Sequence, residues 1–475
     1  MSDGITLPFW LFVFVCIFAA IGIVDRVFAP SVRWFFRRRV NRAIDELNQR
    51  LDTRIQPFKL TRRQSLIDRL IYDPRIVEAV DEEAGATNTP RGVVMKQAER
   101  YAREIVPHFS VTAYFGLGTK LARWASEFVY RVRLGYLDDD SLKRIDPQAT
   151  VIFVMNHRSN MDYVLVTYMA SNRASLSYAV GEWARIWLLQ SVIRSMGAYF
   201  IRRNSGNELY RKVLGRYVAL ATREGVTQAV FPEGGLTRTG HLNEPRLGLL
   251  SYMVAGFDVK KDRDVVFVPV GINYDRVIED RILTARQERE VTGRKFHVSA
   301  GAIAGFVWNL LRLRLQGKLY RYGYACVSFG EPVSLAAWIK KRRLSFPADD
   351  QKRRFAATEK LGKDLMDKIG AVVPALPVAL ASAVFLKNGE DWMQEEELKK
   401  RIFELMAKLE KSGGHVHIPR DDRDYAVSTG LRMLVLRKLV EIDTKGAMRA
   451  APQESVLLGW YANSIAHLLP PPQLA

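Results

Sequence analysis

The segment Asn156-His157-Arg158-Ser159-Asn160-Met161-Asp162 places a histidine and an aspartate five residues apart, directly after an apolar run. A strand-to-helix turn there would bring the two side chains into contact. The carboxylate would fix the tautomer of the ring and stabilise the imidazolium after the other nitrogen takes a proton. No nucleophile is evidently paired with them, although Ser159 is close by. The pattern favours general-base activation of a substrate hydroxyl by His157, with Asp162 as its partner. A helix-capping loop with an incidental histidine is the competing interpretation.

A second polar block, residues 197–203 (GAYFIRR), ends a short apolar run with two arginines. Guanidinium groups grip phosphate through forked hydrogen bonds, so Arg202 and Arg203 are candidates for a phosphate site. A solvated surface pair would look the same on a basic chain.

A third block, residues 231–240, has the sequence FPEGGLTRTG. Its glycines permit a tight turn with exposed amides, and Arg238 adds a positive charge. An ordinary glycine turn remains the alternative. An oxyanion formed when an activated hydroxyl attacks a substrate would need preorganised donors. The amides near residues 159–162 or in the Gly234-Gly235 turn are candidates for that role. A fourth block, residues 267–274 (FVPVGINY), is an apolar strand whose proline predicts a bulge or an edge position.

Short apolar runs predict the strands that must position these blocks: residues 150–155, 176–180, 198–201, 228–231, 265–272 and 324–329. Helical periodicity lies between them, most clearly over residues 208–223. Strands alternating with helices predict an α/β fold, a layered mixed sheet with flanking helices, whose strand ends carry the polar residues. Residues 40–147 instead show a polar, mostly helical pattern, with periodic stretches at 66–80, interrupted at Pro74, and at 94–105.

The composition restricts the class of protein. The 475 residues include 71 Lys and Arg against 51 Asp and Glu, a net charge of +20. Hydrophobic residues make up 48%, which excludes a mostly disordered chain. Two cysteines exclude a disulfide framework and fit a reducing compartment. The charge alone would suit nucleic acid, an anionic membrane or acidic substrates. We expect no nucleic acid, because no zinc pattern, recognition-helix signature or RNA-binding motif is present.

The N-terminal segment favours a membrane. Residues 5–24 form a run of 20 residues without a charged side chain, about the length that crosses a bilayer. Arginines follow and predict that the bulk of the chain is cytoplasmic: Arg26, Arg33, Arg37, Arg38, Arg39 and Arg42. Pro8 and Gly22 leave open a helix lying in one leaflet, and a buried core helix is a further alternative. Residues 302–322 combine an apolar aromatic face with basic residues, which suits either a membrane surface or the protein core.

In order and spacing, the four blocks resemble those of the glycerolipid acyltransferase family, and within it most closely the bacterial membrane-bound glycerol-3-phosphate acyltransferases. NHRSNMDY, GAYFIRR and FPEGG carry the resemblance together. It extends over about residues 58–386 and includes the stretch Phe58-Lys59-Leu60-Thr61-Arg62-Arg63-Gln64. In one place the chain departs from the family pattern: Leu236 and Thr237 stand where the glycerol-3-phosphate enzymes usually have arginine and serine.

The resemblance implies transfer of a fatty acyl group from acyl-CoA or acyl-acyl carrier protein to the 1-hydroxyl of glycerol 3-phosphate, giving lysophosphatidic acid. It implies that His157 is the general base and Asp162 its orienting partner. The acceptor pocket would be lined by Arg202, Arg203, Glu233, Gly234 and Arg238. No metal or cofactor is expected, because the base is a histidine and His415-Val416-His417 lacks a third ligand.

Three alternatives stay open. The FPEGG order also occurs in lysophosphatidic acid acyltransferases, so the acceptor could be lysophosphatidic acid. From other classes, the chain could be an inactive membrane scaffold or a basic nucleic-acid-binding protein. The expected division is a membrane anchor over residues 1–28, a helical N-terminal region over 29–147, an α/β acyltransferase domain over 148–388 and a helical C-terminal region over 389–475. We expect attachment to an anionic phospholipid membrane, the bacterial inner membrane, with the catalytic domain on its cytoplasmic side.

Overall fold

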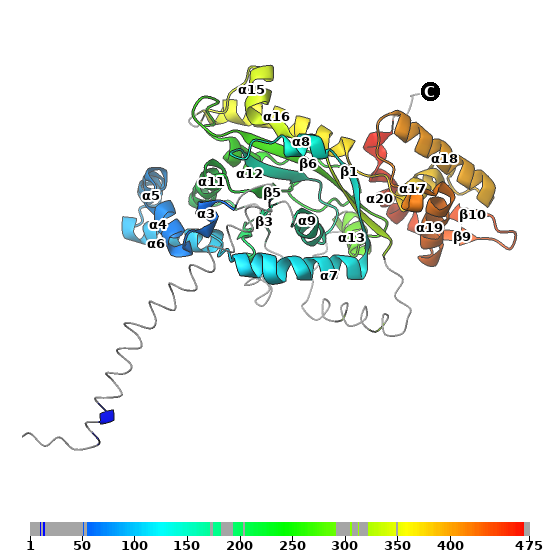
Figure 1. Ribbon diagram of the computed structural model, residues 1–475, viewed down its shortest axis with the longest axis horizontal. Helices are drawn as coiled ribbons and strands as arrows, with labels where there is room; N and C mark the ends of the chain where they lie inside the picture. The colour runs from blue at the N-terminus through cyan, green and yellow to red at the C-terminus, as the bar shows by residue number, and fades with distance from the viewer. Residues whose placement is uncertain are drawn as a thin grey trace, which may run out of the picture.

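The computed structural model describes residues 10, 13–14, 51, 55–171, 174–181, 193–202, 205–290, 305, 312, 322–347 and 350–469. A central sheet lies among helices, with an N-terminal group of helices at one end and a C-terminal bundle at the other (Figure 1). The predicted class, a layered α/β fold with a mixed sheet and flanking helices, is confirmed.

The described residues form one eight-stranded sheet with the order β1-β7-β6-β2-β5-β3-β4, and β8 pairs with β6. Its strands are β1 (Arg131–Leu137), β2 (Thr150–Met155), β3 (Ser177–Val180), β4 (Tyr199–Phe200), β5 (Gln228–Val230), β6 (Val265–Tyr274), β7 (Tyr324–Phe329) and β8 (Val333–Ser334). The strands from β6 to β4 are parallel, whereas β7 and β8 run antiparallel to β6. Each of the predicted strands is present, with bounds that differ by no more than two residues.

Side chains of β2 alternate between two apolar layers, which explains why this strand is an unbroken apolar run. Val151, Phe153 and Met155 join the layer that contains α9 (Asp162–Ala170) and the end of α7 (Thr119–Val129). Ile152 and Val154 join the layer under α11 (Glu208–Arg223), α12 (Leu247–Val254) and α16 (Gln351–Ala371). Each buried aliphatic side chain contributes roughly 1.5–3 kcal/mol, so β2 fixes the start of the loop that carries His157.

Pro269 lies in the interior strand β6 and not at an edge, which was one of the two positions, a bulge or an edge, that its presence suggested. Its neighbour β2 pairs along one side, with Pro269 opposite Val154. On the other side β7 pairs only from Val270 onward and β8 pairs only up to Phe267. Pro269 therefore occupies the gap between two partner strands, where the missing N–H breaks no ladder.

β1 lies within the region expected to be helical. It pairs in parallel with β7 at the edge of the sheet, with a register irregularity between Leu134 and Leu137. Leu134 and Tyr136 are exposed, and arginines occupy other positions of the strand. Because an edge strand need not be covered on both faces, β1 has no continuous apolar run and its sequence did not predict it.

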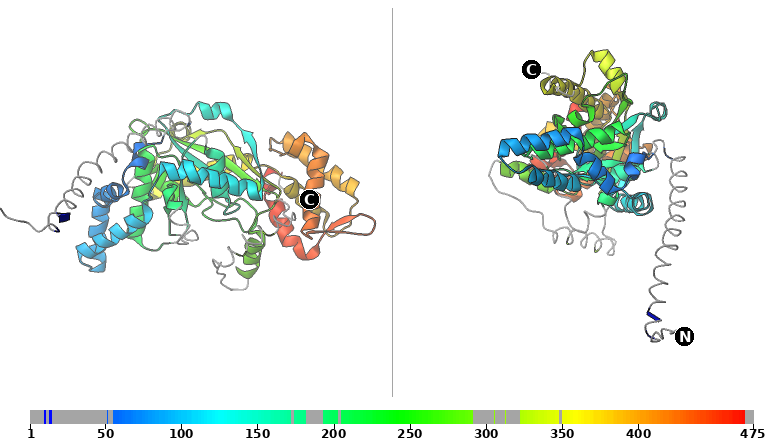
Figure 2. Two further views of the ribbon diagram at one scale, coloured as in Figure 1. Left: turned by 60° about the horizontal axis from the view of Figure 1, so that its bottom comes forward. Right: turned by 90° about the vertical axis from the view of Figure 1, so that its left-hand side faces the viewer.

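The remaining N-terminal helices pack beside the sheet. They are α3 (Pro57–Leu60), α4 (Arg63–Ile71), α5 (Pro74–Thr87), α6 (Arg91–Ile105), the π-helical η2 (Thr112–Gly118) and α7, followed by the short α8 (Asp139–Lys143). Asp73 caps α5 by accepting from the Arg75 amide, and Pro74 opens the helix, so the predicted break falls between α4 and α5. α4, α5 and α6 lie against α11, as the two further views make plain (Figure 2).

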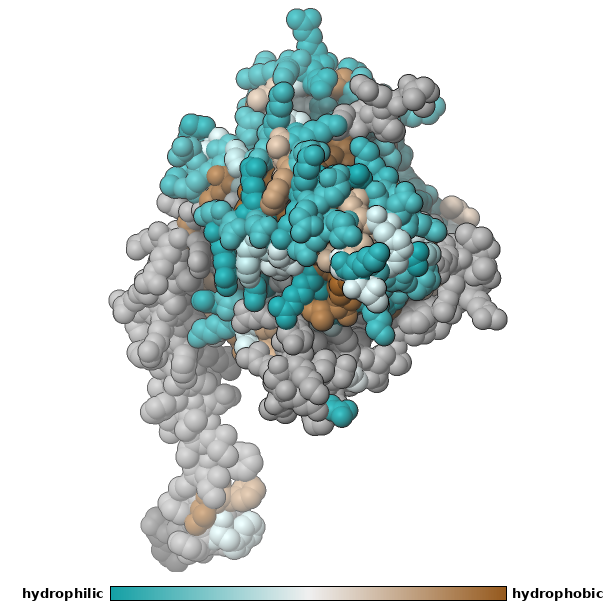
Figure 3. Space-filling view, turned by 90° about the vertical axis from the view of Figure 1, so that its right-hand side faces the viewer, coloured by the Kyte–Doolittle hydropathy of each residue, from teal (hydrophilic) through white to brown (hydrophobic). Residues whose placement is uncertain are grey.

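The C-terminal part forms a bundle beside the end of the sheet. After α13 (Asp280–Glu290) and α15 (Leu335–Arg342), its helices are α17 (Pro377–Asn388), α18 (Glu395–Lys411), α19 (Arg423–Leu436) and α20 (Ser455–Asn463), with the hairpin β9 (Val440–Ile442) and β10 (Met448–Ala450). α17 packs against α18, α19 and α20. The outer face of the bundle is mostly hydrophilic, with small separate apolar patches (Figure 3).

The predicted membrane segments cannot be followed in the structure. Apart from Trp10, Val13 and Phe14, residues 5–24 lie outside the described residues, and so does nearly all of 302–321. Among the helices that the structure does describe, none is both long enough and apolar enough to cross a bilayer.

Candidate active site

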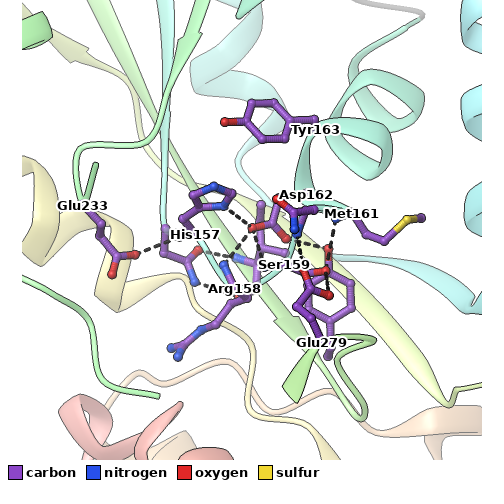
Figure 4. A network of polar contacts seen from close by, with 12 residues as sticks. His157, Arg158, Ser159, Met161, Asp162, Tyr163, Glu233 and Glu279 are labelled. Atoms are coloured by element: carbon purple, nitrogen blue, oxygen red, sulfur yellow. Dashed lines mark hydrogen bonds and ion pairs between the residues drawn. The ribbon is translucent and has the colours of Figure 1, made fainter. Parts of the chain in front are cut away.

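His157 and Asp162 meet in the turn between β2 and α9, as their spacing predicted. β2 ends at Met155 and Asp162 is the first residue of α9. His157 Nδ1 lies 2.9 Å from Asp162 Oδ2 (Figure 4). Both side chains are fully buried, with 1% and 0% of their surfaces exposed. The Nδ1 contact sets the tautomer, because a nitrogen facing a carboxylate must carry the proton.

The Asp162 carboxylate is held by three further donors. Oδ2 also accepts from the amides of Arg158 at 2.7 Å and Ser159 at 3.0 Å. Oδ1 accepts from the hydroxyl of Tyr274, at the end of β6, at 2.6 Å. The carboxylate is therefore fixed from its own loop and from a neighbouring strand, and it can hold the His157 ring in one orientation.

The second ring nitrogen of His157 has no protein partner. Nε2 is buried and makes no hydrogen bond within the described part of the chain. The ring stacks on Phe231 with centroids 4.0 Å apart and meets the edge of Tyr163 at 5.4 Å. A buried polar atom without a partner costs about 1–3 kcal/mol, so this nitrogen is poised to receive a hydroxyl group from a substrate.

The third block lies against His157 and is fastened to it through the main chain. Glu233 Oε1 accepts from the His157 amide at 2.8 Å (Figure 4). The Thr237 amide donates to the His157 carbonyl at 3.1 Å. Glu233 Oε2 accepts from the amide and side chain of Asn243 at 3.0 and 2.8 Å. Burial raises the pKa of Glu233, and the nearby Arg158 guanidinium opposes that shift. Glu233 thus anchors the loop, with both oxygens engaged by protein donors.

The glycine turn offers a main-chain donor. Gly234 has φ +69°, and a Cβ there would lie 2.5 Å from Cδ of Arg246, so only glycine fits. Its amide donates to Phe231 O at 3.0 Å. The next amide, that of Gly235, donates to no acceptor among the described residues. Of the candidate oxyanion donors in this turn, Gly235 is thus the one whose amide makes no hydrogen bond among the described residues.

The other expected donors, the amides near residues 159–162, are engaged by the protein. The Asn160 amide donates to Glu279 Oε1 at 2.7 Å, and Ser159 Oγ donates to Glu279 Oε2 at 2.9 Å. The Met161 amide donates to Ser159 Oγ at 3.1 Å, and the Asp162 amide to Ser159 O at 3.0 Å. Burial raises the pKa of Glu279. These contacts shape the turn and engage each of its four main-chain amides, and the Ser159 hydroxyl is directed to Glu279.

Arg158 ties the first block to the third block and to the C-terminal bundle. Its guanidinium is fully buried and donates to the carbonyls of Gly240 and, at 3.1 Å, Ser464. Burial lowers the pKa of Arg158. Gly240 has φ +85°, and a Cβ there would lie 2.0 Å from the carbonyl oxygen of Trp460 in α20. Asn463 of the same helix donates to Thr239 O at 2.8 Å.

The arginines predicted to hold a phosphate do not all converge on His157. Arg202 forms a two-pronged ion pair with Glu104 of α6, at 3.0 and 2.6 Å. Arg238 lies exposed on the loop of the third block, three residues beyond Gly235. Arg203 lies outside the described residues. The structure therefore gathers His157, Asp162, Glu233 and Gly234 at one site and pairs Arg202 with another helix.

Several residues of the site were not identified from the sequence. Tyr274 is the last residue of a buried strand and Asn156 directly follows another, each within a quoted block, and that position was the available signal. Asn156 bridges β2 to β6 through both polar atoms of its amide, which contact Ile272 at 2.9 and 2.8 Å. No local pattern marks Glu279 or Ser464, because each meets the site from a distant part of the chain.

Comparison with known proteins agrees with the motifs. Residues 138–273 match the family described as acyltransferase, and residues 307–475 match the glycerol-3-phosphate acyltransferase C-terminal region. The resemblance to the glycerolipid acyltransferases, and to bacterial glycerol-3-phosphate acyltransferases among them, is thereby confirmed.

Curated relatives match most of the chain. A glycerol-3-phosphate acyltransferase of Pseudomonas putida is 26% identical over 428 residues, which cover 87% of this chain and 50% of that protein. The enzyme of Xanthomonas campestris pv. campestris is 27% identical over 425 residues, covering 86% of this chain and 46% of the relative. The chain spans about half the length of the curated relatives it matches. The crystal structure of a 1-acyl-sn-glycerophosphate acyltransferase from Thermotoga maritima matches 54% of this chain and 78% of that one, with 17% identity and a TM-score of 0.30.

Proposed function

We propose that this protein is an acyltransferase that moves a fatty acyl group from a thioester to the sn-1 hydroxyl of glycerol 3-phosphate, giving lysophosphatidic acid. The observation that carries the proposal is the state of His157. Its Nδ1 contacts Asp162, while its buried Nε2 has no partner in the described structure. A histidine whose one ring nitrogen donates to a carboxylate and whose other makes no hydrogen bond to the protein is suited to take a proton from an alcohol.

In the proposed reaction, the acceptor hydroxyl donates a hydrogen bond to His157 Nε2 and attacks the thioester carbonyl. The hydroxyl proton passes to Nε2, and the imidazolium is stabilised by Asp162. The oxyanion of the tetrahedral intermediate takes the Gly235 amide as a donor. When the carbon–sulfur bond breaks, Nε2 returns the proton to the leaving thiolate, so the products are an ester and a free thiol. No covalent intermediate on the protein is required.

The proposed acceptor pocket lies over the third block. Arg238 stands on the loop that flanks His157 and supplies a positive charge for the phosphate. Glu233 and Gly234 give this loop its shape. Arg202 can contribute only if it exchanges Glu104 for the phosphate, because both prongs of its guanidinium are engaged. Arg203 remains a proposed ligand on the strength of its position in the GAYFIRR block.

The proposed donors are acyl-CoA and acyl-acyl carrier protein, both acidic, to which a net charge of +20 is suited. No resident metal or cofactor enters the proposed reaction.

We also propose attachment to an anionic membrane, the bacterial inner membrane, on its cytoplasmic side. The apolar run over residues 5–24 and the arginines after it support this proposal. Within the described residues, Leu117, Leu121 and Trp124 of η2 and α7 expose apolar side chains at helical spacing. Lys120 and Arg123 lie beside them, an arrangement that favours an interface with anionic headgroups.

One observation favours a second acceptor. Leu236, which replaces the usual arginine, packs against the apolar core beside the third block. An apolar wall there would suit lysophosphatidic acid, which already carries an acyl chain.

The test offers the purified full chain both acceptors with one labelled acyl donor, as acyl-CoA and as acyl-acyl carrier protein. We expect labelled lysophosphatidic acid from glycerol 3-phosphate. His157→Ala should lower kcat by at least about 100-fold, in line with the usual contribution of a general base. His415→Ala is the matched control, since that ring stacks on Tyr136 away from the site, and it should keep wild-type activity.

Consumption of lysophosphatidic acid alone would reassign the acceptor. Absence of turnover with either acceptor would favour an inactive scaffold, and equal activity of His157→Ala and His415→Ala would overturn the general-base role.

A further inference from the structure

A cavity of about 180 Å³ lies at one end of the strands, and His157 lies at the other end. His157 follows the carboxyl end of β2, and β3, β4 and β5 run parallel to that strand. The cavity is lined by Ser177 at the start of β3 and by Val226 just ahead of β5. It therefore opens at the amino ends of the strands, and the proposed acyl transfer does not use it.

The cavity is built around the stretch Phe58-Lys59-Leu60-Thr61-Arg62-Arg63, which the proposed reaction leaves without a role. Lys59 is 92% buried, since 8% of its surface is exposed. Its Nζ donates to Ser175 O at 2.8 Å and Ser175 Oγ at 3.1 Å, and it lies 4.2 Å from the centre of the Phe109 ring. Among the described residues no carboxylate pairs with it. Burial lowers the pKa of Lys59 well below its usual range.

More positive charge gathers around Lys59. Arg63 also lines the cavity, and it donates to the carbonyls of Val106, at 2.9 Å, and Arg103. Burial and the charges of Arg194 and Arg103 lower the pKa of Arg63. Arg62 and His108 line the exposed part of the cavity. None of the described lining residues is an aspartate or glutamate.

Gly197, the first residue of the second block, packs against Lys59 beside the cavity. Gly197 has φ +88°, and a Cβ there would lie 3.0 Å from Cε of Lys59 and 2.9 Å from the Phe109 ring. The close approach holds the lysine amine beside the cavity. A buried ammonium that lacks a counter-ion is unfavourable unless an anion is supplied, and the cluster of cations makes the need greater.

We propose that this cavity binds the phosphate group of a phosphomonoester, with Lys59 and Arg62 as its main ligands. An ammonium and a guanidinium with no carboxylate between them match a dianionic phosphate. Phe58, Leu66 and Phe109 supply apolar walls, so the organic group attached to the phosphate would contact apolar side chains. The same chemistry is offered by a phosphatidate headgroup and by a soluble phosphate ester.

The test is isothermal titration of the full chain, without acyl donor, with two separate probes. Inorganic phosphate represents the soluble source, and dihexanoyl phosphatidic acid represents the headgroup. We expect at least one probe to bind with a dissociation constant of about 1 mM or lower. Arg62→Ala and Lys59→Met should each weaken that binding about tenfold or more, the value of one charge-assisted pair. Comparable affinity for the two probes would identify a soluble ligand, and tenfold preference for phosphatidic acid a headgroup.

Two controls separate this site from other charges. Arg75→Ala removes an exposed arginine of α5 that does not line the cavity, and it should bind like the wild type. Arg238→Ala removes the charge proposed for the acceptor. Binding that survives in Arg238→Ala and is weakened by Arg62→Ala belongs to the Lys59 cavity, even if the proposed acceptor is wrong. The proposal is overturned if neither probe binds the wild type, or if Arg62→Ala and Arg75→Ala bind equally. Since Arg62 is exposed, its variant should fold even if Lys59→Met does not.

Discussion

Replacing Asp162 with asparagine should remove the charge that stabilises the His157 imidazolium while keeping the turn folded. Asp162 Oδ2 faces two backbone amides, so the asparagine oxygen must take that position. Its amide group then faces the Tyr274 hydroxyl, which can rotate to accept instead of donate. The hydrogen-bond count survives, and the loss is mainly electrostatic.

The size of that loss follows from Coulomb's law. With charge centres about 4 Å apart and an effective dielectric constant near 20, the imidazolium and carboxylate attract by about 4 kcal/mol. Each 1.36 kcal/mol is about tenfold in rate, so kcat of Asp162→Asn should fall about 10³-fold. The assay is initial-rate acyl transfer at saturating acceptor, alongside urea denaturation to establish that the variant is folded.

Two tyrosine variants test how far the contacts of the Asp162 carboxylate contribute to catalysis. Tyr274→Phe removes one hydrogen bond to the carboxylate, worth about 1.5–3 kcal/mol, and it should therefore lower stability. It should lower kcat less than Asp162→Asn does, because the carboxylate charge remains. Tyr130→Phe is its matched control: the two rings lie 5.1 Å apart, and the Tyr130 hydroxyl is buried without a partner in the described structure. Tyr130→Phe should leave kcat unchanged, and it should not lower stability, because the hydroxyl that it removes makes no hydrogen bond among the described residues. A folded Asp162→Asn variant with kcat within about threefold of wild type would show that the carboxylate charge does not stabilise the imidazolium.

The remaining predictions concern the scaffold and its charges. Gly240→Ala should lower the free energy of unfolding by at least about 2 kcal/mol in urea denaturation, because a non-glycine residue at φ +85° is strained and its Cβ would strike the Trp460 carbonyl. Arg202→Ala should cost no more than about 1 kcal/mol of stability, since its pair with Glu104 is partly exposed. If the variant also has a raised KM for glycerol 3-phosphate, Arg202 contacts the phosphate as well. An unchanged KM would limit the role of Arg202 to the ion pair. Burial raises the pKa of Asp275 from 3.8 to about 6, so its neutral form is favoured in the folded protein. Its contribution to stability is full below pH 3.8 and is lost as pH rises to about 6. Relative to Asp275→Asn, the wild type should therefore lose about 3 kcal/mol of unfolding free energy over that interval, and an identical pH dependence of the two proteins would contradict this.

Most strands of the sheet were predictable, because they depend on the local pattern of apolar residues. Strands covered on both faces are apolar at every position, so β2, β6 and β7 appeared as unbroken runs. The contact between His157 and Asp162 was predictable for a similar reason, since a turn of five residues leaves the two side chains little room to separate. The edge strand β1 has no continuous apolar run, because its exposed positions can carry arginines that remain in contact with solvent.

Local sequence patterns were therefore enough to establish the class of fold, the position of the base and its carboxylate, and the resemblance that suggests acyl transfer. The three-dimensional structure was needed to show which distant residues complete the site. Tyr274 reaches Asp162 across 112 residues, and Ser464 reaches Arg158 across 306. It also decided that Arg202 faces Glu104 and that Lys59 is buried beside a cavity. Periodicity in a sequence reports how much of a side chain is buried, but the identity of its partner depends on how the strands and helices are ordered in space.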